Sequence, residues 1–255
     1  RGTIVLEDAE VLAHEAFAGD QFVLRLRSPE CAARALPGQF AHLACDPALP
    51  MRRPISILRA DPRGGWIELL YKAVGQGTRL LARRAVGEVI SVLGPIGAPF
   101  VVREPRPLLI GGGVGMPPMV FLADRLRSEP ATRPFVILGS EVPFPFAARP
   151  SLILVPGLPD GVIGCMPLLD DWGVPSRLAS RQGYPGCFDG FVTGLADAWL
   201  GALDPAARAE VGIYACGPHP MLAAVVELAR RHGLPCQVSL EEYMACGVGG
   251  CAGCA

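Results

Sequence analysis

Three cysteines near the end of the sequence have a spacing that can bind a metal or a cluster. The stretch CGVGGCAGC places Cys246, Cys251 and Cys254 in the pattern C-x4-C-x2-C, with glycines between them. A four-coordinate site needs one more ligand, and no residue follows Ala255 in the sequence as given. The three thiols therefore belong to a redox centre, to a zinc site, or to no metal site at all.

A glycine-rich stretch in the middle of the chain could bind a phosphate group. LLIGGGVGMPPM, at residues 108–119, lies between a predicted buried strand and a predicted helix. Missing side chains let backbone N–H groups and a helix N-terminus approach a diphosphate. Pro117 stands where the third glycine of G-x-G-x-x-G would be, and the first turn of a helix tolerates proline well. Alone, the stretch fits a nucleotide site or an ordinary turn without a ligand.

Three further stretches carry residues that suit anion binding. YACGPHPM, at 214–221, ends another predicted parallel strand, and ligands of open α/β sheets bind outside such ends. RRPISI, at 52–57, offers arginines beside a strand, and YKAVGQGT, at 71–78, offers a glycine–threonine turn that opens a helix. The last two stretches also have ordinary interpretations: RRP can be a solvated arginine pair, and GQGT can be a tight turn without a ligand.

The pattern of polarity changes along the chain and predicts two kinds of domain. Short alternating segments separated by Pro, Gly and Asp predict antiparallel strands of a barrel or sandwich at 21–27, 38–45, 66–74 and 87–95. One short helix is expected among them, at 77–84. Beyond them, predicted strands alternate with predicted helices, which indicates βαβ units and a doubly wound parallel sheet.

These patterns give a fold class and domain limits. We expect an antiparallel N-terminal barrel over residues 1–102, an α/β domain over 103–232, and a small C-terminal segment over 233–255 that carries the cysteine motif. The sequence begins with Arg1, not Met, and we expect it to be part of a longer chain.

Composition gives no reason to expect nucleic acid or an anionic membrane surface as a partner. The chain of 255 residues has a formal net charge of -1 and a pI near 6.5. No apolar run of about 18 residues is free of charges, and no signal segment opens the sequence, so we expect a soluble, cytoplasmic protein. We expect ordinary thiols at Cys31, Cys45, Cys165 and Cys187, and solvated histidines in turns and at helix ends at His14, His42, His219 and His232.

The order of the motifs resembles the ferredoxin reductase superfamily. RPIS, GQGT, GPIGAPF, IGGGVGMPP, CGPHPM and EEYMACGVGGCAGC follow one another over essentially the whole chain. The terminal cysteine motif, preceded by EExM, is most similar to the electron-transfer subunits of the NAD-using class of dihydroorotate dehydrogenase. This resemblance implies FAD, a [2Fe-2S] cluster and NAD as cofactors, and a flavin-containing catalytic partner in a hetero-oligomer. Related subunits of hydrogenases and of ferredoxin-dependent transhydrogenases share the motifs, and a non-catalytic binding module is the alternative from another class.

The resemblance also implies a role for individual residues. Arg53 would pair with the FAD diphosphate, and Ser56 would lie near the flavin ring as a catalytic residue. Cys216 would lie beside the nicotinamide as a second catalytic residue, although a buried core thiol is its other interpretation. The other implied cofactor-binding positions are Pro54, Ile55, Gly75, Gly77, Thr78, Gly112, Gly113, Gly115, Gly217 and Pro218.

The cysteine spacing can now be interpreted more narrowly. C-x4-C-x2-C matches the plant-type [2Fe-2S] pattern, in which the fourth cysteine lies farther along the chain. The resemblance places this ligand shortly beyond Ala255. Cys236 as the fourth ligand and a zinc site are the alternatives, although structural zinc usually takes two C-x2-C pairs and only one is present here.

One acidic residue bears on the choice of nucleotide. Glu141 follows the second predicted strand of the sheet, in LGSEVPFPF, and no basic residue comes before Arg149. An acidic group at this place repels a 2′-phosphate, which favours NAD over NADP. The sequence shows neither a hydrolytic triad nor a residue set suited to deprotonate dihydroorotate, so we expect that chemistry on the partner.

Overall fold

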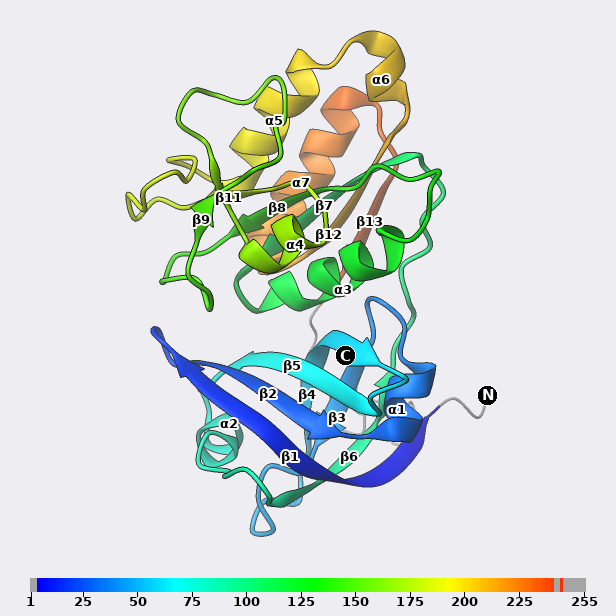
Figure 1. Cartoon of the computed structure of the whole chain (residues 1–255), viewed down its shortest axis with the longest axis vertical. Coiled ribbons are helices and arrows are strands. Elements are labelled where there is room, and N and C mark those ends of the chain that lie inside the picture. Colours follow the sequence, from blue (N-terminus) through cyan, green and yellow to red (C-terminus); the bar gives the residue numbers. More distant parts are fainter. Residues whose placement is uncertain (1–3, 241–243, 245–255) are drawn as a thin grey trace. The chain divides into compact units, whose positions relative to one another are not determined.

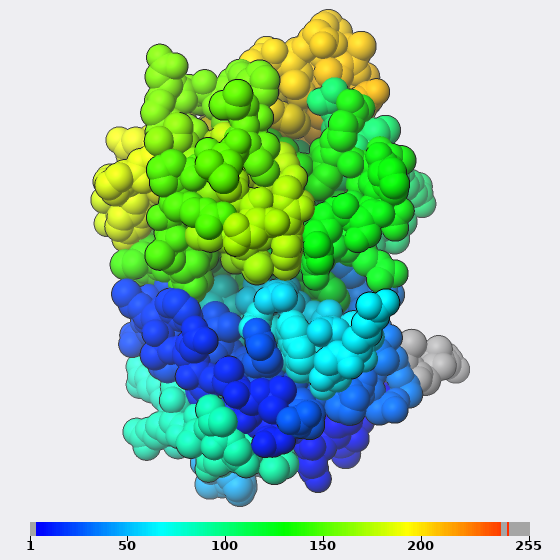
Figure 2. All heavy atoms as spheres, viewed as in Figure 1, coloured from blue at the N-terminus to red at the C-terminus, as the bar shows by residue number. Residues whose placement is uncertain are grey.

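The computed structural model describes residues 4–240 and 244, and its contacts divide the chain into two compact units between Pro99 and Phe100 (Figure 1). In the all-atom view, unit 1 runs from blue to blue-green and unit 2 from green to orange (Figure 2). The sequence placed this boundary slightly later, at residue 103. Phe100 belongs to unit 2 because its ring packs edge-on against Tyr214, with 6.1 Å between the ring centroids.

Unit 1 is a closed antiparallel barrel with the strand order β1-β2-β5-β4-β3-β6. The barrel class predicted from alternating polarity is therefore confirmed, and the predicted strand at 21–27 coincides with β2. Helix α2 is shorter than predicted. The elements are β1 (Val5–Phe17), β2 (Gln21–Arg27), α1 (Pro29–Arg34), β3 (Phe40–Leu43), β4 (Arg53–Asp61), β5 (Trp66–Lys72), α2 (Gln76–Leu81) and β6 (Val89–Ile96).

Two histidines lie inside strands of the barrel, so their expected place in turns was wrong. His42, in β3, is 1% exposed, and burial followed by the charge of Arg52 lowers its pKa. His14, in β1, has Nδ1 2.7 Å from the carbonyl oxygen of Arg84 and Nε2 2.8 Å from the hydroxyl of Tyr71. His42 is therefore a buried core residue, whereas His14 is half-buried and its two hydrogen bonds tie β1 to Tyr71 of β5 and to Arg84.

Unit 2 is built on a parallel sheet with the strand order β11-β8-β7-β12-β13. This confirms the predicted doubly wound parallel sheet. The strands are β7 (Arg106–Gly112), β8 (Phe135–Gly139), β11 (Ser176–Ala179), β12 (Val211–Cys216) and β13 (Cys236–Ser239), and a small pair is formed by β9 (Arg149–Pro150) and β10 (Gly164–Cys165). The helices are η1 (Gly113–Gly115), α3 (Met116–Leu126), α4 (Pro167–Asp171), α5 (Val192–Ala202), α6 (Pro205–Ala209) and α7 (His219–His232).

Helices cover both faces of this sheet. Helices α3 and α4 contact each other on one face, and α5 and α7 contact each other on the opposite face (Figure 1). The chain leaves β7 toward β8 and later returns to β12, on the other side of β7. The strand order therefore reverses between β7 and β12, and ligands of doubly wound sheets bind outside the carboxyl ends of strands at such a point.

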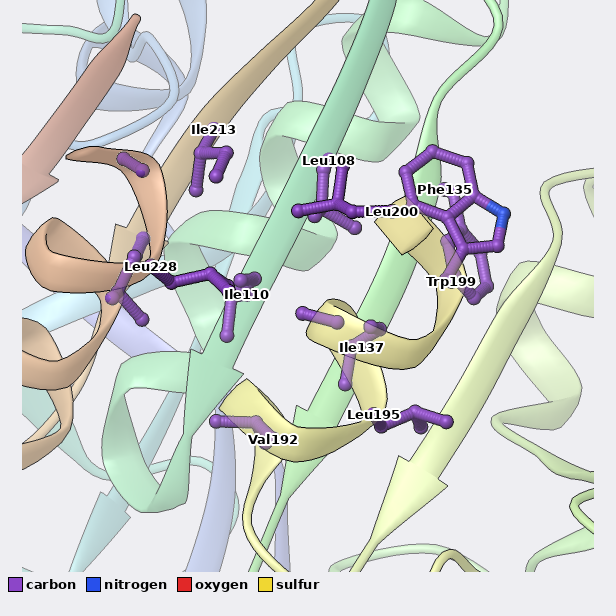
Figure 3. Close-up of a cluster of buried hydrophobic side chains, with 14 of the residues drawn as sticks. Leu108, Ile110, Phe135, Ile137, Val192, Leu195, Trp199, Leu200, Ile213 and Leu228 are labelled. Carbon is purple, nitrogen blue, oxygen red and sulfur yellow. The ribbon is translucent and has the colours of Figure 1, made fainter. Parts of the chain in front are cut away.

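The core of unit 2 lies between the sheet and the α5–α7 layer. In Figure 3, Leu195 and Trp199 of α5 and Leu228 of α7 lie over strands β7, β8 and β12. The sheet contributes Leu108 and Ile110, both fully buried. Strands buried on both faces need nearly continuous apolar sequence, which is why LLI and FVIL at these places predicted buried strands.

The fifth strand corrects the predicted C-terminal segment. Residues 236–239, assigned from sequence to that segment, form β13 and pair in parallel with β12. Cys236 packs against the core cluster of unit 2, and burial raises the pKa of its thiol. This packing disfavours the alternative in which Cys236 is the fourth ligand of a metal site, because its side chain faces a protein core.

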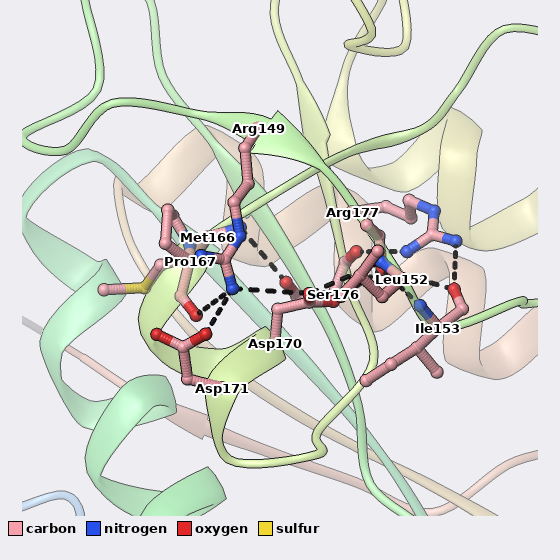
Figure 4. A network of polar contacts seen from close by, with 10 residues as sticks. Arg149, Leu152, Ile153, Met166, Pro167, Asp170, Asp171, Ser176 and Arg177 are labelled. Carbon is pink, nitrogen blue, oxygen red and sulfur yellow. Dashed lines mark hydrogen bonds and ion pairs between the residues drawn. The ribbon is translucent and has the colours of Figure 1, made fainter.

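A network of polar contacts fixes the segment between β8 and β11 (Figure 4). The Asp170 carboxylate accepts a hydrogen bond from the Ser151 hydroxyl at 2.7 Å and pairs with Arg149 at 3.5 Å. Burial disfavours this charge, but the hydrogen bonds and Arg149 outweigh it and lower the pKa of Asp170. Arg177, 4% exposed, donates to the carbonyl oxygen of Ile153 at 2.7 Å. The segment is therefore held by side chains where strand pairing is sparse.

Candidate functional site

The two predicted nucleotide-binding stretches meet at the carboxyl ends of neighbouring strands. Gly111, at the end of β7, is in register with Cys216, at the end of β12. A Cβ atom on Gly115 would lie 2.3 Å from the carbonyl oxygen of Cys216 and 2.5 Å from the backbone nitrogen of Gly217. Glycine at position 115 is therefore required by direct backbone packing between the two turns.

Glycine is needed at positions 112 and 113 for different structural reasons. Gly113 has φ +54°, a left-handed conformation, and a Cβ there would meet nothing within 4 Å. Gly112 faces Met221, whose Sδ would lie 2.4 Å from an added Cβ. The first turn of α3, which starts at Met116, thus follows a backbone turn that is open at Gly113, as a site for a phosphate group requires.

Cys216, Gly217 and Pro218 close the other side of this turn. Cys216 is 1% exposed among the described residues. Its thiol is therefore buried, which agrees with the alternative interpretation of Cys216 as a buried core thiol. Pro218 is exposed and is the N-cap residue of α7. The sequence did not single out Met221 as a contact residue, although it lies inside the CGPHPM motif, and it packs against both Gly112 and Gly217.

The predicted flavin-binding residues of unit 1 also come together. Arg53, at the start of β4, lies against α2, because a Cβ on Gly77 would come within 2.6 Å of the Arg53 Nε. The Arg53 guanidinium donates from one terminal nitrogen to the carbonyl oxygen of Met51 at 2.8 Å and to that of Arg52 at 3.3 Å. Its Nε and other terminal nitrogen form no hydrogen bond with the described residues, which leaves them for an anion.

The adjacent arginine has a different role, which the sequence alone did not reveal. Arg52 donates to the carbonyl oxygen of Ser91 at 2.8 Å and to the Ser91 hydroxyl at 2.9 Å. It also contacts the carbonyl oxygen of His42 at 3.3 Å. Arg52 therefore ties the start of β4 to β3 and β6, and the solvated-pair interpretation of RRP is wrong for this residue.

The N-terminus of α2 is capped by a side chain of the helix itself, that of Thr78. The Thr78 hydroxyl accepts from the Gly75 backbone nitrogen at 3.1 Å and lies 3.2 Å from the Gly75 carbonyl oxygen. A Cβ on Gly75 would meet nothing within 4 Å. Thr78 thus shapes the turn through its side chain, and open space at Gly75 leaves the turn accessible to a ligand.

Three more predicted residues lie along β4. Ile55 is 5% exposed and points into the barrel, whereas Pro54 is exposed. Ser56 is half-buried, is in register with Phe40 of β3, and makes no side-chain hydrogen bond to the residues that the structure describes. The alternation of a strand therefore separates Ile55, a core residue, from Ser56.

Tyr71, in the stretch YKAVGQGT, is a further candidate residue of the site in unit 1 that the sequence analysis did not select. Its ring stacks on Phe22 with 5.4 Å between centroids, and burial raises the pKa of its hydroxyl. The His14 ring fixes that hydroxyl. The signal was its place directly before the glycine turn, at the end of β5.

The predicted cluster ligands Cys246, Cys251 and Cys254 lie outside the described residues. Among residues 4–240 and 244, no group of three His, Cys, Asp or Glu side chains is placed to hold a metal ion. The same part of the chain contains no helix long and apolar enough to cross a membrane.

The structure brings the predicted cofactor-binding residues together in two groups. In unit 1, Arg53 lies against the turn that opens α2, and in unit 2 the turns after β7 and β12 contact each other.

The fold is that of ferredoxin-reductase-like proteins. The chain superposes with a TM-score of 0.76 and 25% identity on the NADH-dependent reduced ferredoxin-NADP oxidoreductase studied for flavin-based electron bifurcation, covering 96% of this chain and 80% of that one. Phthalate dioxygenase reductase, described as a modular structure for electron transfer from pyridine nucleotides to [2Fe-2S], shares the fold with a TM-score of 0.63 at 18% identity, covering 91% of this chain and 68% of that one.

Curated sequences define the family more closely. The chain is 34% identical over 243 residues to the electron transfer subunit of dihydroorotate dehydrogenase B (NAD(+)) of Shouchella clausii, covering 93% of this chain and 83% of that protein. The subunit of the same name from Desulforamulus reducens is 32% identical, with 97% and 87% covered. The chain belongs to the family of dihydroorotate dehydrogenase B (NAD(+)) electron transfer subunits. No family model matches it.

Proposed function

We propose that this chain passes electrons between NAD(H), FAD and a [2Fe-2S] cluster, to or from a flavin-containing catalytic subunit of the dihydroorotate dehydrogenase type. The observation that carries this proposal is the backbone contact between Gly115 and the Cys216–Gly217 turn at the point where the strand order reverses. The relatives' shared name supports both the partner and a place in pyrimidine biosynthesis. The free thiols Cys31, Cys45, Cys165 and Cys187 support a reducing compartment such as the cytoplasm.

Unit 1 supplies the residues that would hold FAD. When bound, a flavin can take two electrons from a nicotinamide and give them singly to a one-electron carrier. Arg53 suits the diphosphate because a guanidinium grips phosphate oxygens with two parallel hydrogen bonds. Gly75, Gly77 and Thr78 would shape a turn that admits phosphate, and Pro54, Ile55 and Ser56 would continue the site along β4.

Unit 2 supplies the residues that would hold the pyridine nucleotide. Gly112, Gly113 and Gly115 would let the backbone approach its diphosphate, and the positive end of the α3 dipole would favour the negative charge. Cys216, Gly217 and Pro218 would lie beside the nicotinamide. Cys246, Cys251 and Cys254 would hold the cluster through their thiolates.

Replacing Arg53 by alanine is expected to weaken FAD binding roughly 10- to 150-fold, because a charge-assisted contact of this kind contributes about 1.5–3 kcal/mol. Equilibrium release of flavin, followed by its fluorescence, measures the effect. Arg63→Ala is the matched control, since Arg63 is exposed in the turn between β4 and β5. Equal flavin retention in both variants would remove Arg53 from the site.

NADH is expected to reduce the bound flavin much faster than NADPH does. Glu141 lies two residues after the end of β8, and a carboxylate at this place repels the 2′-phosphate of NADP. Anaerobic stopped-flow absorbance with each nucleotide measures the rate and tests the proposed function as a whole. Faster reduction by NADPH would show the inference from Glu141 to be wrong, and a purified protein that cannot take up FAD would favour a non-catalytic binding module.

A second candidate function rests on the likeness to the NADH-dependent reduced ferredoxin-NADP oxidoreductase. In it, the chain would serve a transhydrogenase or a hydrogenase in place of dihydroorotate dehydrogenase. Supplying the reduced chain with a dihydroorotate dehydrogenase catalytic subunit and orotate, or with ferredoxin, separates the two. Electron transfer to ferredoxin alone would favour this second candidate.

A further inference from the structure

Unit 2 has a cavity at the end of its sheet opposite the nucleotide turns. Its volume is about 460 Å³, within the range typical of small-molecule sites. It lies where strands β7, β8 and β11 begin, since Arg106 opens β7, Phe135 opens β8 and Pro175 directly precedes β11. In Figure 1 this is the end of unit 2 that carries α6.

The cavity is too far from the nucleotide turns to be part of them. Strand β7 runs from Arg106, in the cavity wall, to Gly112, in the glycine turn. A strand rises about 3.3 Å per residue, which separates the two ends by roughly 20 Å. A ligand in this cavity would therefore be a different molecule from the proposed NAD(H).

Three arginines give the cavity a positive charge. The Glu210 Oε2 atom accepts from Arg106 Nε at 2.8 Å and from a terminal nitrogen of Arg133 at 2.8 Å, so two guanidinium groups share one carboxylate. The third, Arg127, pairs with Asp124 at 2.6 Å. Both terminal nitrogens of Arg106, and the Nε and one terminal nitrogen of Arg133, form no hydrogen bond with any described residue. These four groups can donate to an anion.

Aromatic side chains form the rest of the wall. Of the three tryptophans in the sequence, Trp172 and Trp199 line this cavity. The Arg127 guanidinium lies 4.9 Å from the centroid of the Trp172 ring, and Trp199 packs against Phe135 with 5.0 Å between centroids. Figure 3 shows Trp199 at the end of α5, beside Phe135. Because Trp199 is 6% and Phe135 3% exposed, the half-buried Trp172 is the ring on which a planar ligand can stack.

The cavity is also preformed. Pro134 and Pro175 line it directly before β8 and β11, Pro156 lines it from the loop between β9 and β10, and proline restricts the backbone of all three loops. The loops before β8 and β11 are also held by hydrogen bonds, with Arg133 N donating to the Pro105 carbonyl oxygen at 2.8 Å and Val136 N to that of Pro175 at 3.0 Å. A ligand would therefore meet walls that need little ordering, which lowers the entropic cost of binding.

We propose that this cavity is a binding site for a planar heteroaromatic anion. The ring would lie along the tryptophan wall, and its carboxylate or phosphate would accept hydrogen bonds from Arg106 and Arg133. Charge disfavours a cation here, and the guanidinium donors would stay unpaired beside a neutral apolar molecule. The site is independent of the proposed electron transfer, because none of its residues belongs to the nucleotide or flavin groups.

Calorimetric titration of the FAD-loaded protein tests the site, with NAD(+) at saturation to occupy the nucleotide turns. Uridine 5′-monophosphate and orotate are the probes for a ring with a phosphate and a ring with a carboxylate. At least one is expected to bind with a Kd below about 1 mM. Uracil, which lacks the anion, and ribose 5-phosphate, which lacks the ring, are each expected to bind at least about tenfold more weakly.

Variants connect that binding to the cavity. Arg133→Ala and Trp172→Leu are each expected to raise the Kd at least about tenfold, whereas Arg125→Ala should leave it unchanged. Arg125 is the matched control because it is exposed on α3, two residues from Arg127, and does not line the cavity. Thermal melting of each variant confirms that it is folded. Binding of neither probe, or equal binding by Arg133→Ala and Arg125→Ala, would overturn the proposal.

Discussion

Cys251→Ser is expected to abolish electron delivery to the partner subunit while leaving reduction of the flavin by NADH largely intact. Cys251 is the middle residue of the C-x4-C-x2-C motif, and a serine oxygen is a poor ligand for an iron–sulfur cluster, which thiolates hold. Glycines between the cysteines would allow a tight ligand loop with N–H groups directed at the cluster sulfurs, so loss of one thiolate should disrupt the site. Flavin reduction needs only the NAD(H) and FAD residues.

Two measurements test this expectation on the full-length protein reconstituted anaerobically with iron and sulfide. The unaltered protein should bind about two irons per chain in the plant-type arrangement, and Cys251→Ser should bind far less. Cys187→Ser is the control, because Cys187 is a half-buried thiol whose pKa burial raises. Unchanged iron content and unchanged transfer to the partner in Cys251→Ser would show that the three cysteines are not ligands.

The fold could be predicted where local pattern and tertiary environment agree. Strand β2, with the sequence QFVLRLR, alternates in polarity and faces a barrel core on one side, so its limits followed from the sequence. Strand β1 did not stand out, because VLEDAEVLAHEAF is rich in Glu and Ala, which favour helices. Pairing with both β2 and β6 overrides that preference, and no local signal reports it.

In the candidate site, too, the local sequence could not predict contacts between residues that are far apart in the chain. Motif order identified the turns at Gly115 and Cys216, but their backbone contact joins residues a hundred positions apart and follows only from strand order. Arg52 and Arg53 are identical in type and adjacent, yet Arg52 binds Ser91 whereas two nitrogens of Arg53 stay available. The cavity where strands β7, β8 and β11 begin was not predicted, because the loops that form it carry no motif.

Gly115→Ala is expected to weaken NADH binding strongly, although the change adds one methyl group. The added Cβ would lie 2.3 Å from the Cys216 carbonyl oxygen and 2.4 Å from its carbonyl carbon. These are backbone atoms at the end of β12, which pairs with β7 on one side and β13 on the other, so they cannot yield as a flexible side chain would. The clash must move the start of α3 away from the Cys216–Gly217 turn.

Such overpacking costs typically 1–3 kcal/mol, and here it falls on the two turns that would hold one nucleotide. We therefore expect the KM for NADH to rise at least about tenfold, with a lower melting temperature for unit 2 and unchanged retention of FAD by unit 1. Gly201→Ala is the matched control: Gly201 is an exposed α5 residue whose added Cβ would meet nothing within 4 Å. Alanine favours a helix over glycine, so this control should keep its KM and melt at the same or a higher temperature. If Gly115→Ala reduced flavin with the KM of the unaltered protein, the contact between the two turns would not be what positions the nucleotide.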